Sequence, residues 1–215
     1  MAKNLCNMLF IEDDIVWGAV FKYIRQKERS VRHRARQCKV LMTTIRRFTC
    51  DDLFNFNNVN LDVLTETYNL PFYLLYLARW PEYCQVAEGP GQQIMAYILG
   101  KAEGKGELWH GHVTAVTVAP DFRRQHLAQK LMHILEHVTD KVHNAYFVDL
   151  FVRKSNSLAI GMYQKFGYVK YREVLGYYSG SENAYDMRKA MPRDKLRKSV
   201  IPLKRPVKPE ELEFD

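Results

Sequence analysis

The pattern of apolar and polar positions along the chain predicts a mixture of strands and helices. Short apolar runs, alternating or continuous, predict strands at residues 43–48, 84–88, 94–99, 112–118, 146–152, 168–174 and 185–189. Helical spacing and capping signals predict helices at residues 15–39, 51–58, 71–80, 124–138 and 155–166. This order is that of an α/β fold with a mixed central sheet flanked by helices.

Three segments carry the clearest structural signals. The helix at 124–138 has apolar positions at helical spacing, namely Leu127, Leu131, Leu135 and Val138, so one face packs on a sheet. Residues 146–152 are almost continuously apolar, which is typical of a central strand covered on both faces. Gly89-Pro90-Gly91 predicts a hairpin between the strands that flank it.

Composition divides the 215 residues into one domain with two tails. Residues 1–41 hold nine basic and four acidic side chains, which is more than half of the net charge of +8. Such an extension either contacts RNA or another polyanion, or is a solvated positive helix, and the second explanation is the more frequent. Residues 42–191 contain the predicted sheet. Residues 192–215 form a Pro-rich tail that docks on a surface or stays mobile.

Several classes of protein are excluded by simple features. No apolar run approaches the roughly 18 residues that a membrane span needs, so no membrane partner is predicted. Glu12-Asp13-Asp14 interrupts the apolar start where a signal peptide needs a continuous run, and import presequences avoid acids. The four cysteines form no CxxC pair, which favours a reducing compartment over a disulfide framework. We therefore expect a cytoplasmic protein.

A basic loop joins the strand ending at Val118 to the start of the next helix. It contains Arg123-Arg124-Gln125-His126-Leu127-Ala128. Exposed amides at a helix N-terminus, aligned with the helix dipole and reinforced by arginines, make a site for a pyrophosphate. By itself, however, this segment is better explained as an ordinary basic loop.

A second motif follows the central strand and makes the pair specific. Asn156, Ala159, Tyr163 and Gly167-Tyr168 have the spacing N-x-x-A-x-x-x-Y-x-x-x-G-[FY]. Together the two elements resemble the acetyl-CoA site of the GNAT N-acetyltransferases. Within them, TTIRRFTCDDLFNFNNVNLD, WHGHVTAVTVAP and FVDLFVR resemble the family of NatB catalytic subunits, and the resemblance runs from Met42 to about Glu210. The stretch before Met42 has no counterpart in it.

The resemblance implies the GNAT acyl-CoA N-acyltransferase fold, in which strands 112–118 and 146–152 splay apart to admit the acetyl thioester. Acetyl-CoA is the implied co-substrate, held by the backbone near Val116 and Val118, by residues 123–128, and by Asn156 and Tyr163. The implied reaction is direct transfer to the α-amine of nascent chains beginning Met-Asp, Met-Glu, Met-Asn or Met-Gln. Because this route has no covalent enzyme intermediate, no nucleophilic residue is needed. The implied partners are a helical-repeat auxiliary subunit and, through it, the ribosome.

The candidate catalytic residues are His112 and Tyr163. An α-amine has a pKa of about 8, so part of it is neutral at physiological pH and only a weak base is required. His112 either removes the proton, directly or through water, or merely orients substrate, and the two roles stand equal. Tyr163 either donates a proton to the departing thiolate or is a buried aromatic residue, and its place in the motif favours the first.

Candidate substrate-binding residues come from two loops and one strand, again by resemblance. Glu66 and Tyr68 lie in the linker before the helix at 71–80, and Tyr177-Tyr178 lie in the loop before the last strand. Aromatic walls suit a methionine side chain, whereas hydroxyl groups together with His112 or Thr114 suit a polar second residue.

Two further features of the sequence bear on cofactor binding and on metal binding. His126 stands where the family loop has its first glycine, and an imidazole there adds bulk beside the pyrophosphate or pairs with it when protonated. This leaves two alternatives open: a non-catalytic paralogue that still binds the auxiliary subunit, and a GNAT enzyme acting on another amine such as lysine. No metal is predicted, because the pairs His133/His137 and His110/His112 have no evident third ligand.

Overall fold

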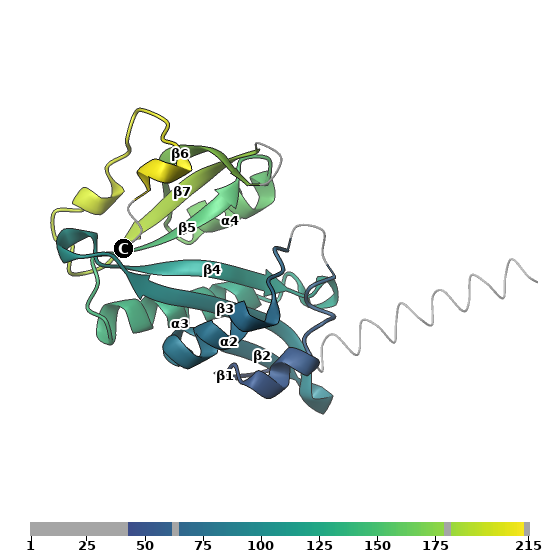
Figure 1. The fold of residues 1–215 in the computed structure, drawn as a ribbon. Helices are drawn as coiled ribbons and strands as arrows, with labels where there is room; N and C mark the ends of the chain where they lie inside the picture. The colour runs from purple at the N-terminus through teal and green to yellow at the C-terminus, as the bar shows by residue number, and fades with distance from the viewer. Residues whose placement is uncertain (1–42, 62–64, 179–181, 213–215) are drawn as a thin grey trace, which may run out of the picture. The chain divides into compact units, whose positions relative to one another are not determined.

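The computed structural model describes residues 43–61, 65–178 and 182–212, so the basic extension and the helix expected at 15–39 lie outside the described residues. From Thr44 onward the chain forms one compact unit. Its strands are β1 (Thr44–Arg47), β2 (Gln85–Gly89), β3 (Gln93–Glu103), β4 (His110–Val118), β5 (Phe147–Arg153), β6 (Val169–Tyr178) and β7 (Glu182–Ala190). They form one mixed sheet in the order β1-β2-β3-β4-β5-β7-β6 (Figure 1).

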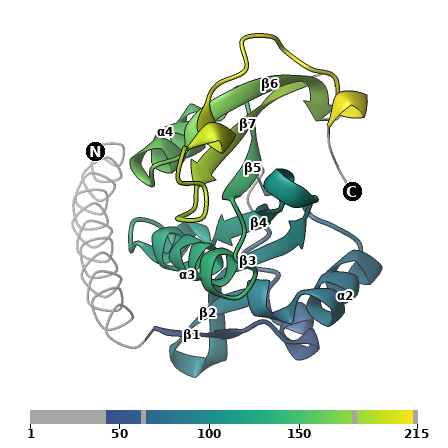
Figure 2. The same ribbon diagram turned by 90° about the vertical axis from the view of Figure 1, so that its left-hand side faces the viewer.

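Helices cover both faces of this sheet (Figure 2). They are α2 (Leu70–Arg79), α3 (Leu127–Lys141) and α4 (Ser157–Lys165). The apolar face of α3 packs on the sheet as predicted, with Leu131 and Leu135 fully buried. Tyr168, three residues after the end of α4, donates a hydrogen bond to Glu136 of α3. This bond ties the segment after α4 to α3 on one face of the sheet. Helix α2 lies on the other face.

The strands β4 and β5 are parallel neighbours that separate half-way along their length. They pair from His110 opposite Phe147 to Val113 opposite Leu150. Beyond that point β5 keeps its partner β7, while residues 115–118 of β4 pair only with β3. The backbone groups on one edge of β4 are therefore available to a ligand, as the resemblance implies.

Three expected boundaries were wrong. The helix expected at 51–58 is a short 3-10 helix, Cys50–Phe54, because Phe56 and Val59 leave the helical path to enter the core. Helix α3 begins at Leu127 rather than at residue 124, because Arg124 and His126 adopt left-handed backbone angles, with φ of 62° and 60°. A left-handed residue cannot continue a right-handed helix.

The third error concerns β6 and the C-terminal tail. Tyr177 and Tyr178 are the last residues of β6, not part of a loop. The described part of the tail docks on this strand: Val207 bridges to Val174, and the amide of Leu203 donates to the carbonyl of Tyr171 at 2.7 Å. Docking, rather than mobility, is thus the outcome for these residues. No helix in the described ranges is long and apolar enough to cross a bilayer.

Candidate active site

A cleft of about 580 Å³ opens where β4 and β5 separate. Nine of the residues predicted to hold the cofactor line it: Val116, Val118, Arg123, Arg124, His126, Leu127, Ala128, Asn156 and Tyr163. The remaining one, Gln125, does not line the cleft, and its Oε1 is buried without a hydrogen-bond partner. Sequence spacing therefore located the cleft walls but not this side chain.

The basic loop presents the start of α3 to the cleft. The first bond within the helix runs from the amide of Lys130 to the carbonyl of His126, so the amides of Leu127, Ala128 and Gln129 have no partner in the helix. Arg123 donates from Nε to the carbonyl of Val118 at 3.3 Å, which fixes the loop against the end of β4. Unpaired amides and the positive end of the helix dipole suit an anion.

His126 occupies the position where the family has glycine, and its backbone has the left-handed conformation that glycine favours. Its side chain is exposed, and Nδ1 donates to Oε1 of Gln129 at 3.2 Å. The imidazole thus lies at the cleft mouth and does not fill the cleft. His126 therefore adds backbone strain, about 1–2 kcal/mol for a residue other than glycine, and does not add bulk inside the cleft.

Two residues of the second motif form the opposite wall. Asn156 caps α4, because its Oδ1 accepts from the amide of Ala159 at 3.1 Å. Only its amide nitrogen is therefore left to donate to a ligand. Tyr163 is 8% exposed, and burial raises the pKa of its hydroxyl to about 12. The hydroxyl is consequently protonated at physiological pH and able to donate.

His112 lies on the sheet face opposite α3 and is buried. Its Nδ1 is 2.8 Å from Oδ1 of Asp149, which stands directly opposite on β5. Burial opposes ionisation of Asp149, but the neighbouring His110 and His112 outweigh it and hold the pKa of the carboxyl below its usual range. The ionised carboxylate accepts the Nδ1 proton. Nε2 of His112 then carries the lone pair and can accept a proton.

The linker before α2 crosses β4 beside His112. Tyr68 donates from Oη to the carbonyl of Thr114 at 3.4 Å and stacks on Phe72 at 4.2 Å. The Thr114 hydroxyl donates to the hydroxyl of Tyr76 at 3.0 Å. Burial raises the pKa of Tyr68, so it remains a neutral donor. These contacts bring the predicted residues Tyr68 and Thr114 together.

Glu66 reaches the other strand. Its carboxylate pairs with Arg153 at the end of β5, and Arg153 also donates to Glu182 of β7 at 2.8 Å. Hydrogen bonds to Glu182 and Glu66 raise the pKa of the Arg153 guanidinium. Glu66, which also lines the cleft, therefore ties the linker to β5 across the gap.

Tyr177 and Tyr178 converge on Phe151 of β5. The Tyr177 ring stacks on that of Phe151 at 4.6 Å, and the Phe151 ring lies 5.6 Å from that of His112. Tyr178 donates to the carbonyl of Phe151 at 3.2 Å and lines the cleft. Burial, and then Asp149, raises the pKa of Tyr177 to about 12. All six predicted substrate residues thus gather round the separating ends of β4 and β5.

Sequence reasoning missed Asp149, Phe151 and Arg153. The three alternate along β5, in the segment FVDLFVR. A carboxylate in an otherwise apolar central strand was a usable signal, because such a group is buried only with a partner. Nothing local pointed to Phe151 or Arg153.

The comparisons with known proteins agree with this geometry. The profile of the Acetyltransferase (GNAT) family matches residues 50–168. The chain belongs to this family. A catalytic subunit of the N-terminal acetyltransferase B complex from Arabidopsis thaliana is 66% identical over 174 residues, covering 81% of this chain and all of the relative. The N-alpha-acetyltransferase 20 of Dictyostelium discoideum is 67% identical over 168 residues, covering 78% and 97%.

A solved GNAT structure supports the same assignment. Naa20 of Chaetomium thermophilum, in complex with a bisubstrate analogue, matches with a TM-score of 0.73 and 44% identity, covering 78% of this chain and 97% of that one. The resemblance to NatB catalytic subunits, the GNAT fold and the enzyme class, an N-terminal acetyltransferase, are confirmed by these matches.

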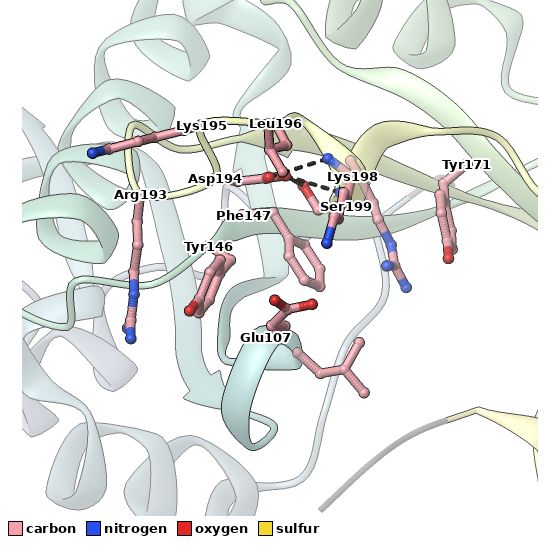
Figure 3. A pocket seen from close by; sticks show the side chains of 12 residues that line it. Glu107, Tyr146, Phe147, Tyr171, Arg193, Asp194, Lys195, Leu196, Lys198 and Ser199 are labelled. Carbon is pink, nitrogen blue, oxygen red and sulfur yellow. Dashed lines mark hydrogen bonds between the residues drawn. The ribbon is translucent and has the colours of Figure 1, made fainter.

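The GNAT domain has a second cavity, of about 380 Å³, on which none of the predicted site residues lies (Figure 3). Arg193, Lys195 and Lys198 contribute basic groups to it. Asp194 holds the segment in place, since its carboxylate accepts from the amides of Lys198 and Ser199. Arg193 donates to the carbonyl of Asn144.

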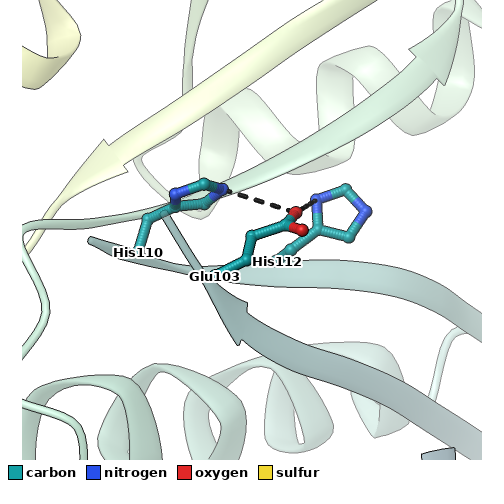
Figure 4. Close-up of side chains that lie close together, drawn as sticks. All are labelled: Glu103, His110 and His112. Atoms are coloured by element: carbon teal, nitrogen blue, oxygen red, sulfur yellow. Dashed lines mark ion pairs between the residues drawn. The ribbon is translucent and has the colours of Figure 1, made fainter. Parts of the chain in front are cut away.

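The sequence offered no third ligand beside His110 and His112, but the fold supplies one. Glu103 of β3 pairs with His110 in the sheet register. Its carboxylate and the two imidazoles place one ligand atom each within 4.8 Å of one another (Figure 4). The expectation that His110 and His112 have no third ligand was therefore wrong.

Proposed function

We propose that this chain transfers the acetyl group of acetyl-CoA to the α-amine of nascent chains beginning Met-Asp, Met-Glu, Met-Asn or Met-Gln, as the catalytic subunit of a NatB complex. One observation carries the proposal: nine of the ten predicted cofactor residues line a single cleft that ends at the gap between β4 and β5, where the substrate residues gather. The two reactants of an acetyl transfer therefore meet at one place.

The cleft has the groups that acetyl-CoA requires. The unpaired amides at the start of α3, with Arg123 and Arg124 beside them, bind the pyrophosphate. The open edge of β4 near Val116 and Val118 hydrogen-bonds the amides of the pantetheine arm, as a further strand would. The side-chain amide of Asn156 donates to the same arm.

His112 and Tyr163 manage the protons. Asp149 holds the Nδ1 proton of His112, so Nε2 accepts the proton released by the α-amine, through a water molecule, as the new amide bond forms. Tyr163 donates its hydroxyl proton to the sulfur that leaves as CoA. Since burial raises the pKa of Tyr163 to about 12, the donor form is the resting form.

The substrate N-terminus binds between the linker and the end of β6. Aromatic rings of Tyr68, Tyr177 and Tyr178 make an apolar wall for the methionine side chain. Thr114 and the tyrosine hydroxyl groups read a polar second residue. Glu66, close to Arg153, places a carboxylate at the entrance, where it attracts the protonated amine.

The proposed partner is a helical-repeat auxiliary subunit, which brings the enzyme to the ribosome in the cytoplasm. The support is twofold. Relatives of this chain are subunits of the acetyltransferase B complex, and a NatB complex bound to a bisubstrate inhibitor matches it with a TM-score of 0.69 and 40% identity, over 80% of this chain. Helix α2 also exposes Leu70, Leu74 and Leu75, by 54%, 41% and 52%.

A peptide panel tests the proposal, with the auxiliary subunit present. We expect acetylation of Met-Asp, Met-Glu, Met-Asn and Met-Gln peptides, and none of the same peptides with a blocked N-terminus. Acetylation of an internal lysine in a peptide with a blocked N-terminus would identify the lysine amine, instead of the α-amine, as the acetyl acceptor. Lack of turnover together with lack of acetyl-CoA binding by calorimetry would identify a non-catalytic paralogue.

A further inference from the structure

Four side chains on three neighbouring strands point to one place. His110 and His112 alternate on β4, Glu103 lies opposite His110 on β3, and Asp149 lies opposite His112 on β5. All four are at least about nine-tenths buried, with side-chain exposures of 5–11%. Strand register, rather than flexible loops, therefore sets the positions of two imidazoles and two carboxylates.

The hydrogen bonds around this cluster leave metal-ligating atoms facing one another. The Leu108 carbonyl accepts the Nδ1 proton of His110 at 2.6 Å, so Nε2 is the ring atom left for a ligand. That Nε2 is 3.7 Å from Oε1 of Glu103 and 3.5 Å from Oδ1 of Asp149. Oε1 of Glu103 is buried and has no hydrogen-bond partner, while its other oxygen pairs with Lys101. Oε1 is thus a buried ligand atom beside two imidazoles.

We propose that Glu103, His110 and His112 form a binding site for Zn²⁺, with Asp149 beside it on β5. The spacing of the ligand atoms suits a tetrahedral ion. Zinc bonds of about 2.0–2.2 Å separate neighbouring ligand atoms by roughly 3.3 Å. Here Oε1 of Glu103 is 3.7 Å from Nε2 of His110 and 4.0 Å from Nδ1 of His112, and each of the three residues places a ligand atom within 4.8 Å of the others. A shortening of these separations by at most about 1.5 Å reaches the required distances, and a water molecule completes the tetrahedron.

The donor set also favours zinc. Imidazole nitrogen suits zinc and disfavours calcium and magnesium, which take oxygen ligands. The backbone carbonyl of Leu108 orients His110 in the way that a second layer of groups orients metal-binding histidines.

Binding of Zn²⁺ is tested on the untagged full chain. Zn²⁺ is titrated against a chromophoric chelator at neutral pH, with wild type, Glu103→Gln and the control His133→Asn. His133 is a histidine of α3 with an 85% exposed side chain. We expect one equivalent in wild type and the control, and at least about tenfold weaker binding in Glu103→Gln. No binding by wild type, or equal binding by Glu103→Gln, would overturn the site.

X-ray absorption spectroscopy of wild type loaded with one equivalent of Zn²⁺ uses no variant, so its result does not depend on whether a variant folds. Two imidazoles and oxygen ligands at about 2.0–2.2 Å support the site, and sulfur at about 2.3 Å would overturn it in favour of the four cysteines.

Discussion

Asp149 accepts the Nδ1 proton of His112 across the next-to-last paired positions of β4 and β5, at 2.8 Å. One pair further on, at Val113 and Leu150, the pairing ends, and the cleft begins where the two strands separate. The sheet thus fixes the imidazole where substrate and cofactor meet, and the carboxylate determines which of its nitrogens holds the proton.

Asp149→Asn should lower kcat by about 10–100-fold and change the KM for acetyl-CoA little, because an amide no longer selects the Nδ1 tautomer. Nitrogen NMR of the labelled imidazole reports the tautomer directly. Asp140→Asn, a change on the far end of α3, is the matched control. An unaltered tautomer combined with reduced kcat would mean that Asp149 acts only on the packing of the sheet.

His126→Gly should raise the free energy of unfolding by up to about 1 kcal/mol and tighten acetyl-CoA binding, because glycine adopts φ near 60° without strain. Gln92→Gly is the control, since Gln92 has φ of 59° in a turn that does not line the cleft. Denaturant unfolding and calorimetry measure the two effects. Gln92→Gly should change stability alone, and equal affinity gains in both variants would contradict a local effect at the loop.

Tyr163→Phe should reduce kcat by about 100-fold, through loss of the proton donor. Because burial raises the pKa of Tyr163 above 10 to about 12, the donor form persists up to about pH 11. Profiles of kcat from pH 7 to 10 should therefore have the same shape in wild type and variant, at different heights.

Tyr83→Phe is the control for this prediction. Tyr83 is fully buried, with its hydroxyl 3.1 Å from that of Thr139, and does not line the cleft. Its loss should cost about 1 kcal/mol of stability and leave kcat unchanged. An alkaline limb below pH 10 that disappears in Tyr163→Phe would contradict the burial of Tyr163.

Glu66→Gln should raise the KM for a Met-Asp peptide about fivefold, because the linker loses its ion pair with Arg153 and the amine loses a nearby carboxylate. Glu182→Gln removes the other partner of Arg153, on the β7 side. This matched change should leave the peptide KM within about twofold of wild type. Equal effects of the two variants would show that Arg153, not Glu66, positions the substrate.

The chain's local patterns determined the class of fold and the walls of the cofactor cleft. Helical spacing in α3 and the motif from Asn156 to Tyr168 depend on residues within a few turns of one another. Such signals can be recognised without knowing which residues lie across the sheet. They led to the acetyl-CoA site, to the candidate acid and base, and to the family.

Tertiary structure alone decided which side chains face each other. Glu103 meets His110, and Asp149 meets His112, only because the register of β3, β4 and β5 sets residues far apart in the chain side by side. The left-handed angle of His126 and the docking of Val207 on β6 likewise depend on surroundings that no local pattern encodes. Short-range spacing follows from backbone geometry, whereas pairing between distant strands follows from the packing of the whole core.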